Sequence, residues 1–475
     1  MGYQELKSRD YGVNLCDGCL EKQREIDRLK AENLRLKQKL NQNLRKTNEG
    51  FFNSSTSSSK IPVKTSGSVG NQAKKGGGQF GHVGSGRKVF TSFGADEQRT
   101  VEVEIELCPA CECGLKSQSA NERAVYELEI ERVKKIYYTI KRKQCPNCRK
   151  IVSGKVKNAF PRVSMSNELV VEVAEQHYLL GRSLGQIAER FELSYPTVAE
   201  SLRRIGQKLK PNLERLKQLY RLSQVRHADE TGWRTDGSNG YAWYFGSAET
   251  SLYLFRNTRS GKVVAEVFGT EQLSGVLVVD QYAGYNQVRC SIQYCYAHLL
   301  RKQEDLAKEF PKNREIQNYT KQMRKRLGQA MKLRTKGFSE VGYLKQANRI
   351  KEQILKLSGR TAKHPAVRKW QDFYVEKAER LYHRCRGCRD EKIPAENNYA
   401  EREVRKIVIA RKISYGSQSE TGAETREIWT SVLASLKKRE ANPRAKLVEG
   451  LNKLSEDENF DLAEFLFGEA LSKSD

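Results

Sequence analysis

The stretch "SGVLVVDQYAGYN", residues 274–286, decides the fold of the central part of this chain. Its four aliphatic residues, 276–279, predict a buried strand, and Asp280 follows where that strand ends. A carboxylate at the end of an apolar strand is costly to bury unless a partner compensates its charge. Asp280 therefore either caps the turn that follows it or, as we expect, helps to hold a cation.

The neighbouring segments predict the sheet to which this strand belongs. "VRHADETGW", "YAWYFGSA" and "SLYLFRN" are strand-like, "SGKVVAEVFG" is helical, and "SIQYCYAHLLRKQEDLAKEF" is a short strand that runs into a helix. The order βββαβαβα, with three antiparallel strands followed by crossovers, is that of the ribonuclease-H-like fold. In that fold the first and fourth strands are adjacent, so Asp229 should face Asp280. Two like charges this close require a cation between them.

We expect this cation to be Mg²⁺ or Mn²⁺, because both prefer oxygen ligands. A later helix, "NNYAEREVRKIVIARK", offers a third carboxylate from either Glu401 or Glu403, which lies two positions on and off the same helical face. Glu230 competes with Asp229, but side chains alternate along a strand, so only one of them faces the site. Two metal ions held in this way activate water or a 3′ hydroxyl and stabilise the leaving oxygen of a phosphodiester.

The bulk composition points to a nucleic-acid partner. The chain has 475 residues, enough for three or four domains, with a formal net charge of +27 and a pI of about 9.6. No signal-peptide core and no apolar run of membrane-spanning length is visible, so we expect a cytoplasmic, nucleoid-associated protein without a membrane partner. The 11 cysteines gather in CxxC pairs, which favours metal binding over disulfides.

Residues 100–160 predict a zinc-binding segment. The motifs "CPACECG" and "CPNC" form a CxxC…CxxC pattern that presents four thiolates tetrahedrally to Zn²⁺. The metal would replace a core that the segment is too small to build, whereas plain structural cysteines are the alternative. Cys113 is expected to be a spectator. The four expected ligands are Cys108, Cys111, Cys145 and Cys148. The other pairs form either a second, discontinuous metal site or free thiols: Cys16, Cys19, Cys385 and Cys388.

Residues 161–215 predict a helix-turn-helix-like DNA-binding region. In "SLGQIAERFELSYPTVAESLRRI", "ELS" makes the turn, Ser194 caps the second helix and Pro196 suits its first turn. The second helix would present Arg203 and Arg204 to DNA. A plain helical hairpin without a DNA role is the alternative.

The remaining ranges complete an α/β multidomain architecture. Residues 1–45 predict a coiled-coil helix with Asn33 in an a position, unless this is a solvated surface helix. Residues 46–99 predict a flexible Gly/Ser-rich basic linker. Residues 222–302 and 391–440 form the two parts of the core, and residues 303–390 between them form an α-helical insertion. Residues 441–475 form a helical tail.

Several motifs resemble a known family. "HADETGW", "VVDQYAGYN", "CYAHLLRK" and "NNYAEREVRKIVIARK" are similar to the successive signatures of the bacterial insertion sequence 66 family of transposases, of the DDE type. The similarity extends to "GGGQFGHVG", to the "CPAC…CPNC" segment and to "NPRAKLVEGLNKL". The resemblance implies a ribonuclease-H-like core with a helical insertion before the last catalytic residue. It maps an acidic triad onto Asp229, Asp280 and Glu401; Phe80 and Tyr296 depart from the family's usual Pro and Trp.

Supporting residues surround this expected triad. Cys295 and His298 form a CxxH motif, which is half a metal site and, in the resembled family, a recurrent motif close to the active site. The alternative is a buried cysteine and a histidine that orients its neighbours. Trp233 and Asn398 would shape the site or touch the DNA end, with packing as the alternative, and Arg402 is a further supporting candidate.

These features favour an enzyme over two other classes. The expected enzyme is a DNA transposase that binds terminal inverted repeats, cuts at the element ends and joins them to target DNA as a homodimer or higher oligomer. Accessory proteins of the same element are further candidate partners. The alternative is a DNA-binding regulator with zinc, helix-turn-helix and an inactive nuclease core, which the intact triad disfavours. A nuclease or resolvase without joining activity is disfavoured by the arm, the zinc segment and the insertion.

Overall fold

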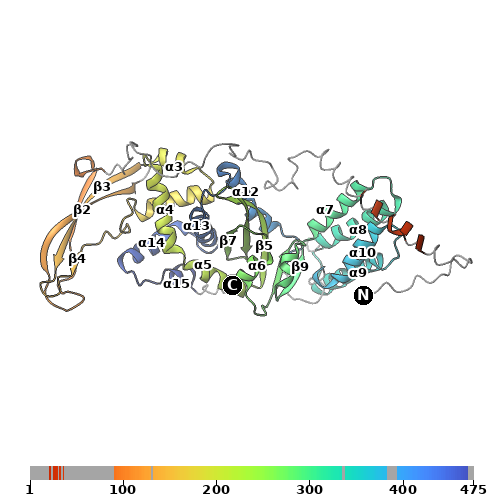
Figure 1. Cartoon of the computed structure of the whole chain (residues 1–475). Coiled ribbons are helices and arrows are strands. Elements are labelled where there is room, and N and C mark those ends of the chain that lie inside the picture. Colours follow the sequence, from red (N-terminus) through yellow and green to blue (C-terminus); the bar gives the residue numbers. More distant parts are fainter. Residues whose placement is uncertain are drawn as a thin grey trace, which may run out of the picture. The chain divides into compact units, whose positions relative to one another are not determined.

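The chain has a mixed α/β architecture with two mixed sheets and many helices (Figure 1). The computed structural model describes residues 90–468 except 130–131, 334–336 and 382–392, together with 21–22, 25–29, 32–33 and 36. Phe80 and the cysteine pairs 16/19 and 385/388 lie outside the described residues. One compact unit comprises Met1–Thr56, Leu299–Ser339 and Asn348–Glu376, and the rest of the chain forms the other.

The first sheet is built around a long hairpin. Strands β2 (Lys116–Glu129) and β3 (Arg132–Gln144) pair antiparallel, β1 (Glu97–Val101) runs parallel to β3, and β4 (Ile151–Ser153) pairs with the far end of β3. The inward side chains Val125, Ile136, Tyr138, Ile140, Val156 and Ala159 form a small core. The sequence motifs did not indicate this hairpin. The sheet begins at Glu97, inside the range assigned to the linker.

The second sheet has the strand order β7-β6-β5-β8-β9. Its members are β5 (Val225–Thr235), β6 (Ser238–Gly246), β7 (Ser251–Arg256), β8 (Val276–Val279) and β9 (Ser291–Tyr294). The first three are antiparallel, whereas β8 runs parallel to both β5 and β9. Val225 lies opposite Val276 and His227 opposite Val278, so the first and fourth strands are neighbours, as the sequence predicts.

Helices cover both faces of this sheet because its side chains alternate. Phe245 on β6 packs against Tyr220 and Phe268, from α5 (Asn212–Leu222) and α6 (Gly261–Phe268). The preceding residue, Tyr244, belongs to the core cluster on the opposite face. This cluster also contains residues of α12 (Asn398–Ser414) and α13 (Glu420–Arg439). A short 3-10 helix, Ala283–Gln287, follows β8.

Helix α13 protects the outer edge of the sheet. Three of its side chains, spaced four residues apart, accept the N–H groups that β7 directs away from the sheet, at 2.9–3.1 Å. An uncovered strand edge would present unpaired N–H groups to other chains. The acceptor and donor pairs are Ser435 with Ser251, Ser431 with Tyr253, and Glu427 with Phe255.

Local capping fixes the helices between the two sheets. Ser183 and Gln186 form a capping box at the start of α3 (Leu184–Arg190), and Ser194 accepts the N–H of Thr197 at the start of α4 (Tyr195–Leu209). Ile187 of α3 and Val198 of α4 are both buried. Further helices in the same unit are α2 (Asn167–Ala174), the π-helix Glu175–Leu179, α11 (Ala378–Leu381), α14 (Pro443–Glu456) and α15 (Leu462–Phe467).

In the unit that holds most of the predicted insertion, every regular element among the described residues is a helix. Its helices are α8 (Arg314–Met331), α10 (Pro365–Glu376), most of α7 (Tyr296–Glu309) and part of α9 (Glu340–Ser358). Near the N-terminus the described residues are helical, with Ile26, Leu29 and Leu36 exposed. Within the described ranges, no helix combines the length and apolar character that crossing a bilayer requires.

Candidate catalytic site and metal centre

The side chains of Asp229 and Glu230, which are neighbours on β5, point to opposite faces of the sheet. Asp229 lies opposite Tyr244 on β6, which belongs to the core cluster shared with α12, and Glu230 lies opposite Trp243. The Glu230 carboxylate, with only 3% of its side chain exposed, forms an ion pair with Arg259 and accepts the Tyr285 hydroxyl at 2.7 Å. Glu230 is therefore occupied on its own face, and Asp229 is the carboxylate directed toward α12.

The charges of distant carboxylates converge on Asp229. Burial, followed by the negative charges of Glu230, Asp280 and Glu401, raises the pKa of Asp229 well above its usual value. Asp280 also accepts the N–H of Tyr282 at 2.8 Å, so the capping role weighed from the sequence is present as well. Capping uses one carboxylate oxygen and does not prevent the other from binding a cation.

The tightest group of possible ligands near these aspartates includes only one residue of the expected triad. Among the described residues, the ligand atoms of Cys295, His298 and Glu401 all lie within 4.8 Å of one another. The aspartates are not part of that group, so the three carboxylates are more widely spaced than the sequence led us to expect. His298 Nδ1 lies 3.6 Å from Glu401 Oε1.

The two competing glutamates of α12 have different surroundings. Glu403 accepts the Tyr253 hydroxyl at 2.8 Å and is bonded to Lys406 at 2.8 Å. Glu401, in the first turn of α12, instead lies beside Cys295 and His298. Of the two glutamates, Glu401 is the one whose charge contributes to the raised pKa of Asp229.

Asn397 is a positioning residue that the sequence analysis missed. Its Nδ2 donates to the Ala228 carbonyl at 2.8 Å, so its Oδ1 accepts from His227 Nδ1 at 2.9 Å. Its backbone N–H donates to Cys295 Sγ at 3.1 Å. Burial lowers the pKa of His227 to about 4, which keeps this contact neutral. The doubled asparagine in "NNYAER" is the signal that could have indicated Asn397, whereas the sequence prediction names its neighbour Asn398, which begins α12.

The other supporting candidates occupy different environments. Trp233 is 1% exposed, packs edge-on against Phe255 with ring centres 5.0 Å apart, and donates from Nε1 to Ser417 Oγ at 3.2 Å. These contacts favour the packing alternative for Trp233. Arg402 is exposed on α12, and its charge contributes to the lowered pKa of His227 after burial.

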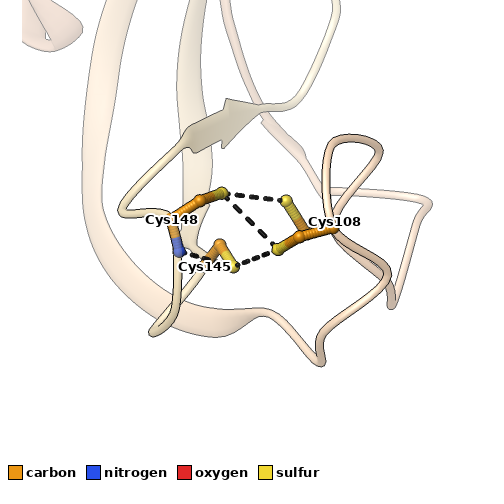
Figure 2. Close-up of side chains that lie close together, drawn as sticks. Cys108, Cys145 and Cys148 are labelled. Carbon is orange, nitrogen blue, oxygen red and sulfur yellow. Dashed lines mark hydrogen bonds between the residues drawn. The ribbon is translucent and has the colours of Figure 1, made fainter.

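Four cysteines converge at one end of the first sheet (Figure 2). The sulfur of Cys108 lies 3.5 Å from that of Cys148, and the sulfur of Cys111 lies 3.3 Å from that of Cys145 and 3.6 Å from that of Cys148. All four sulfurs lie within 4.8 Å of one another. Four sulfurs this close match the donor set of a structural Zn²⁺ site.

The backbone of the two motifs is shaped alike. Glu112 and Arg149 each follow the second cysteine of a pair in the left-handed region, at φ 56° and 57°. Each donates its N–H to the carbonyl of the first cysteine of its pair. The backbone hydrogen bond at Cys113 and the contact with Cys145 lower the pKa of the Cys111 thiol to about 6. This favours the thiolate that a metal requires.

The arginines expected to contact DNA are paired with a glutamate. Arg203 donates two hydrogen bonds to Glu200, and Arg204 donates one, all at 2.7 Å. These contacts lower the pKa of Glu200 to about 2. A cavity of about 830 Å³, which Arg203 lines together with residues 415–419, lies beside this helix.

Residues 161–425 match the family model described as Transposase IS66 family. The chain belongs to this family. The matched range holds Asp229, Asp280, Glu401 and the CxxH motif, whereas the four-cysteine group precedes it. Membership in the IS66 family supports a transposase function and implies a DNA partner and a divalent metal ion. No curated protein matches the chain.

The four-cysteine group should bind zinc and lose it when one of its cysteines is replaced. Metal analysis of the purified protein should find about one zinc per chain at the four-cysteine group, and Cys145→Ser should lose it, because three thiolates hold zinc less well than four. Cys113→Ser is the matched control and should keep the zinc, since Cys113 lies outside the group. A zinc-free protein with an intact first sheet would contradict this.

The raised pKa of Asp229 predicts a pH-dependent stability change. Below the unfolded pKa of about 3.9 the Asp229 carboxyl is neutral in both the folded and the unfolded state. As the pH rises toward the folded pKa, the carboxyl ionises in the unfolded chain but not in the folded one, which increasingly favours unfolding. Asp229→Asn should therefore raise the melting temperature of the protein without added magnesium, little near pH 4 and most at neutral pH. Added Mg²⁺ should narrow the difference by stabilising the wild type.

Thermal denaturation across this pH range measures the effect. Glu230→Gln is the comparison variant. Because burial and the charge of Asp280 raise the pKa of Glu230 despite its ion pair with Arg259, it should show the same pH trend with a smaller gain. A gain for Asp229→Asn that is equal at all pH values would instead indicate a packing effect.

Proposed function

We propose that this chain is a DNA transposase that binds the terminal inverted repeats of its element and catalyses metal-dependent strand cleavage and transfer at the ends. The observation that carries the proposal is the convergence of the charges of Asp280 and Glu401 on buried Asp229. Carboxylates from two adjacent strands and a distant helix repel one another here, and this repulsion is costly unless a bound cation compensates their charge. Family membership supports the same activity.

The core that holds these residues is, in this proposal, ribonuclease-H-like. The order β7-β6-β5-β8-β9, with three antiparallel strands followed by two parallel ones, supports this assignment. The helical residues between α7 and α12 are then an insertion ahead of the last acidic residue. The alternative of a regulator with an inactive core would leave the converging charges unexplained.

The residues present fit a divalent metal of the Mg²⁺ or Mn²⁺ class. Asp229, Asp280 and Glu401 offer oxygen donors, which these ions prefer, and the unfavourable charge at Asp229 is the kind that a bound cation relieves. When bound, such ions activate the attacking oxygen and stabilise the leaving oxygen. Because the carboxylates do not form a closed group, we infer that DNA and metal together draw them closer.

Other residues of the chain hold the acidic groups in place. Asn397 fixes the start of α12 against β5, which sets the position of Glu401 one turn later. The Tyr253 hydroxyl and Lys406 keep Glu403 bonded elsewhere. Arg259 forms an ion pair with Glu230 and holds its carboxylate on the face opposite Asp229.

We further propose that α3 and α4 form a helix-turn-helix that binds DNA and that the four cysteines hold Zn²⁺. The capped helices, the buried residues between them and the net charge of +27 support the first assignment. The convergent sulfurs support the second. Exposed Ile26, Leu29 and Leu36 support a coiled-coil contact in a homodimer or higher oligomer on DNA, to which accessory proteins of the element could add.

Removing any acidic residue of the triad should abolish the reaction. Asp229→Asn, Asp280→Asn and Glu401→Gln should each reduce cleavage by at least about 100-fold, the usual effect of losing a group that stabilises the transition state. The substrate is a pair of duplexes that carry the DNA on either side of the coding sequence, incubated with Mg²⁺. Strand cleavage and joining are followed on sequencing gels.

Glu403→Gln is the matched control for the triad and should keep activity, because Glu403 is bonded to Tyr253 and Lys406. All variants should still bind DNA, since the carboxylates that they lose repel the DNA phosphates and do not contribute to binding. Cleavage that survives Asp280→Asn would overturn the assignment. Loss of activity in Glu403→Gln but not in Glu401→Gln would keep the reaction class and exchange the residue.

DNA binding should depend on the arginines of α4 and on salt. Arg203→Ala or Arg204→Ala should weaken binding by about 1–3 kcal/mol, and Glu200→Gln should strengthen it by releasing both guanidinium groups. Fluorescence anisotropy at several salt concentrations measures both effects, and affinity should fall steeply with salt. Binding that is independent of salt, or unchanged in all three variants, would contradict the role of α4.

A further inference from the structure

The group formed by Cys295, His298 and Glu401 differs in chemistry from the oxygen-donor site. It joins a thiol, an imidazole and a carboxylate, and the ligand atoms of all three lie within 4.8 Å of one another. Hard ions such as Mg²⁺ avoid sulfur, whereas Zn²⁺ and related ions take sulfur, nitrogen and oxygen together. The closest-packed ligands beside the carboxylates are therefore suited to a different class of ion.

The backbone holds this group in a fixed arrangement. Cys295 directly follows β9, and its N–H donates to the Val279 carbonyl at 2.8 Å. His298 lies in the first turn of α7, and Glu401 in the first turn of α12. The N–H of Tyr296 donates to the Ala395 carbonyl at 2.9 Å, which joins the start of α7 to the segment that leads into α12.

The environment of the sulfur suits a metal ligand. Cys295 is fully buried, and its Sγ accepts the backbone N–H of Asn397 at 3.1 Å. An N–H directed at the sulfur stabilises a thiolate and orients it. His298 and Glu401 are half-buried, so an ion can reach the group from their side. Three protein ligands would leave a fourth position of a tetrahedral ion open.

We propose that Cys295, His298 and Glu401 form a site for a thiophilic divalent ion of the Zn²⁺ class, and that this ion inhibits the enzyme by occupying Glu401. A carboxylate that is bound to Zn²⁺ is withdrawn from the Mg²⁺ or Mn²⁺ that catalysis needs. The binding stands on the geometry alone, whereas the inhibition rests on the proposed function.

Binding is tested with Co²⁺ as the probe, because thiolate coordination gives Co²⁺ an intense near-ultraviolet absorption. The full-length protein, prepared with one zinc per chain at the four-cysteine group, is titrated with Co²⁺ and compared with Cys295→Ser, so that the difference spectrum excludes any exchange at the four-cysteine group. Wild type should bind about one more ion per chain than the variant, with the thiolate band. Cys290→Ser, which changes a half-buried cysteine outside the group, should behave as wild type.

A second variant guards against a folding defect. His298→Gln should weaken Co²⁺ binding by at least about tenfold while keeping the thiol, because even outer-shell partners of a metal contribute that much. Circular dichroism and thermal denaturation establish that each variant is folded. Equal Co²⁺ binding by wild type and folded Cys295→Ser, or a difference spectrum between them without a thiolate band, would overturn the proposal.

Inhibition is tested by adding Zn²⁺ to the Mg²⁺-dependent cleavage assay, with each variant normalised to its own activity without Zn²⁺. Wild type and Cys290→Ser should be inhibited at the same Zn²⁺ concentration, and Cys295→Ser should need at least about tenfold more. Equal inhibition of all three would overturn the inhibitory role. A chain that binds Co²⁺ as expected but cleaves no DNA would refute the proposed function and leave the metal site standing.

Discussion

Asn397 ties α12 to the sheet through its side chain and its backbone together. Its amide bridges His227 and the carbonyl of Ala228 on β5, while its N–H reaches Cys295 at the end of β9. Closing a loop as long as the predicted insertion has an entropic cost that only specific contacts at its end can offset. These buried hydrogen bonds return the chain to the sheet in one register, and Glu401 follows one turn later.

The same contacts create an electrostatic conflict that fits the proposed chemistry. Asp229 is buried among negative charges in a chain whose formal net charge is +27. The overall charge draws a DNA backbone toward the protein, whereas the local carboxylates repel its phosphates. A divalent cation between them reconciles the two, which makes metal binding and DNA binding mutually supportive in the proposed transposase. The conflict extends to Glu230, whose pKa burial and the charge of Asp280 raise, and the ion pair with Arg259 offsets part of it.

The sheet can hold these charges because its remaining groups are satisfied. Ser431 and Ser435 of α13 bond to the outward N–H groups of β7, so the edge strand is closed by side chains of its own chain. Aromatic residues pack on both faces, with Trp243 and Phe245 on one and Tyr244 and Trp233 on the other. A packed, hydrogen-bonded sheet of this kind resists relaxation, so the unfavourable charge at Asp229 persists instead of being relieved by movement.

The sequence by itself determined whatever depends on short-range patterns. The apolar run before Asp280 defined β8, the CxxC spacing defined the cysteine group, and the cap at Ser194 defined the start of α4. The pairing of Glu200 with Arg203 was also within reach, because residues three apart on a helix are neighbours. The sequence prediction lacks the hairpin β2–β3, because it rests on the cysteine motifs of that segment and not on the strand pattern between them.

Only the tertiary structure decided which groups share the site. The choice of Glu401 over Glu403 depends in part on the Tyr253 hydroxyl, which comes from another strand. Asn397 could not be preferred to Asn398 without the contacts to His227 and Cys295. Likewise, Glu401 joins Cys295 and His298 only because α12 packs beside the CxxH motif. Local spacing encodes helices, strands and caps, whereas contacts between distant segments depend on how all of them pack together.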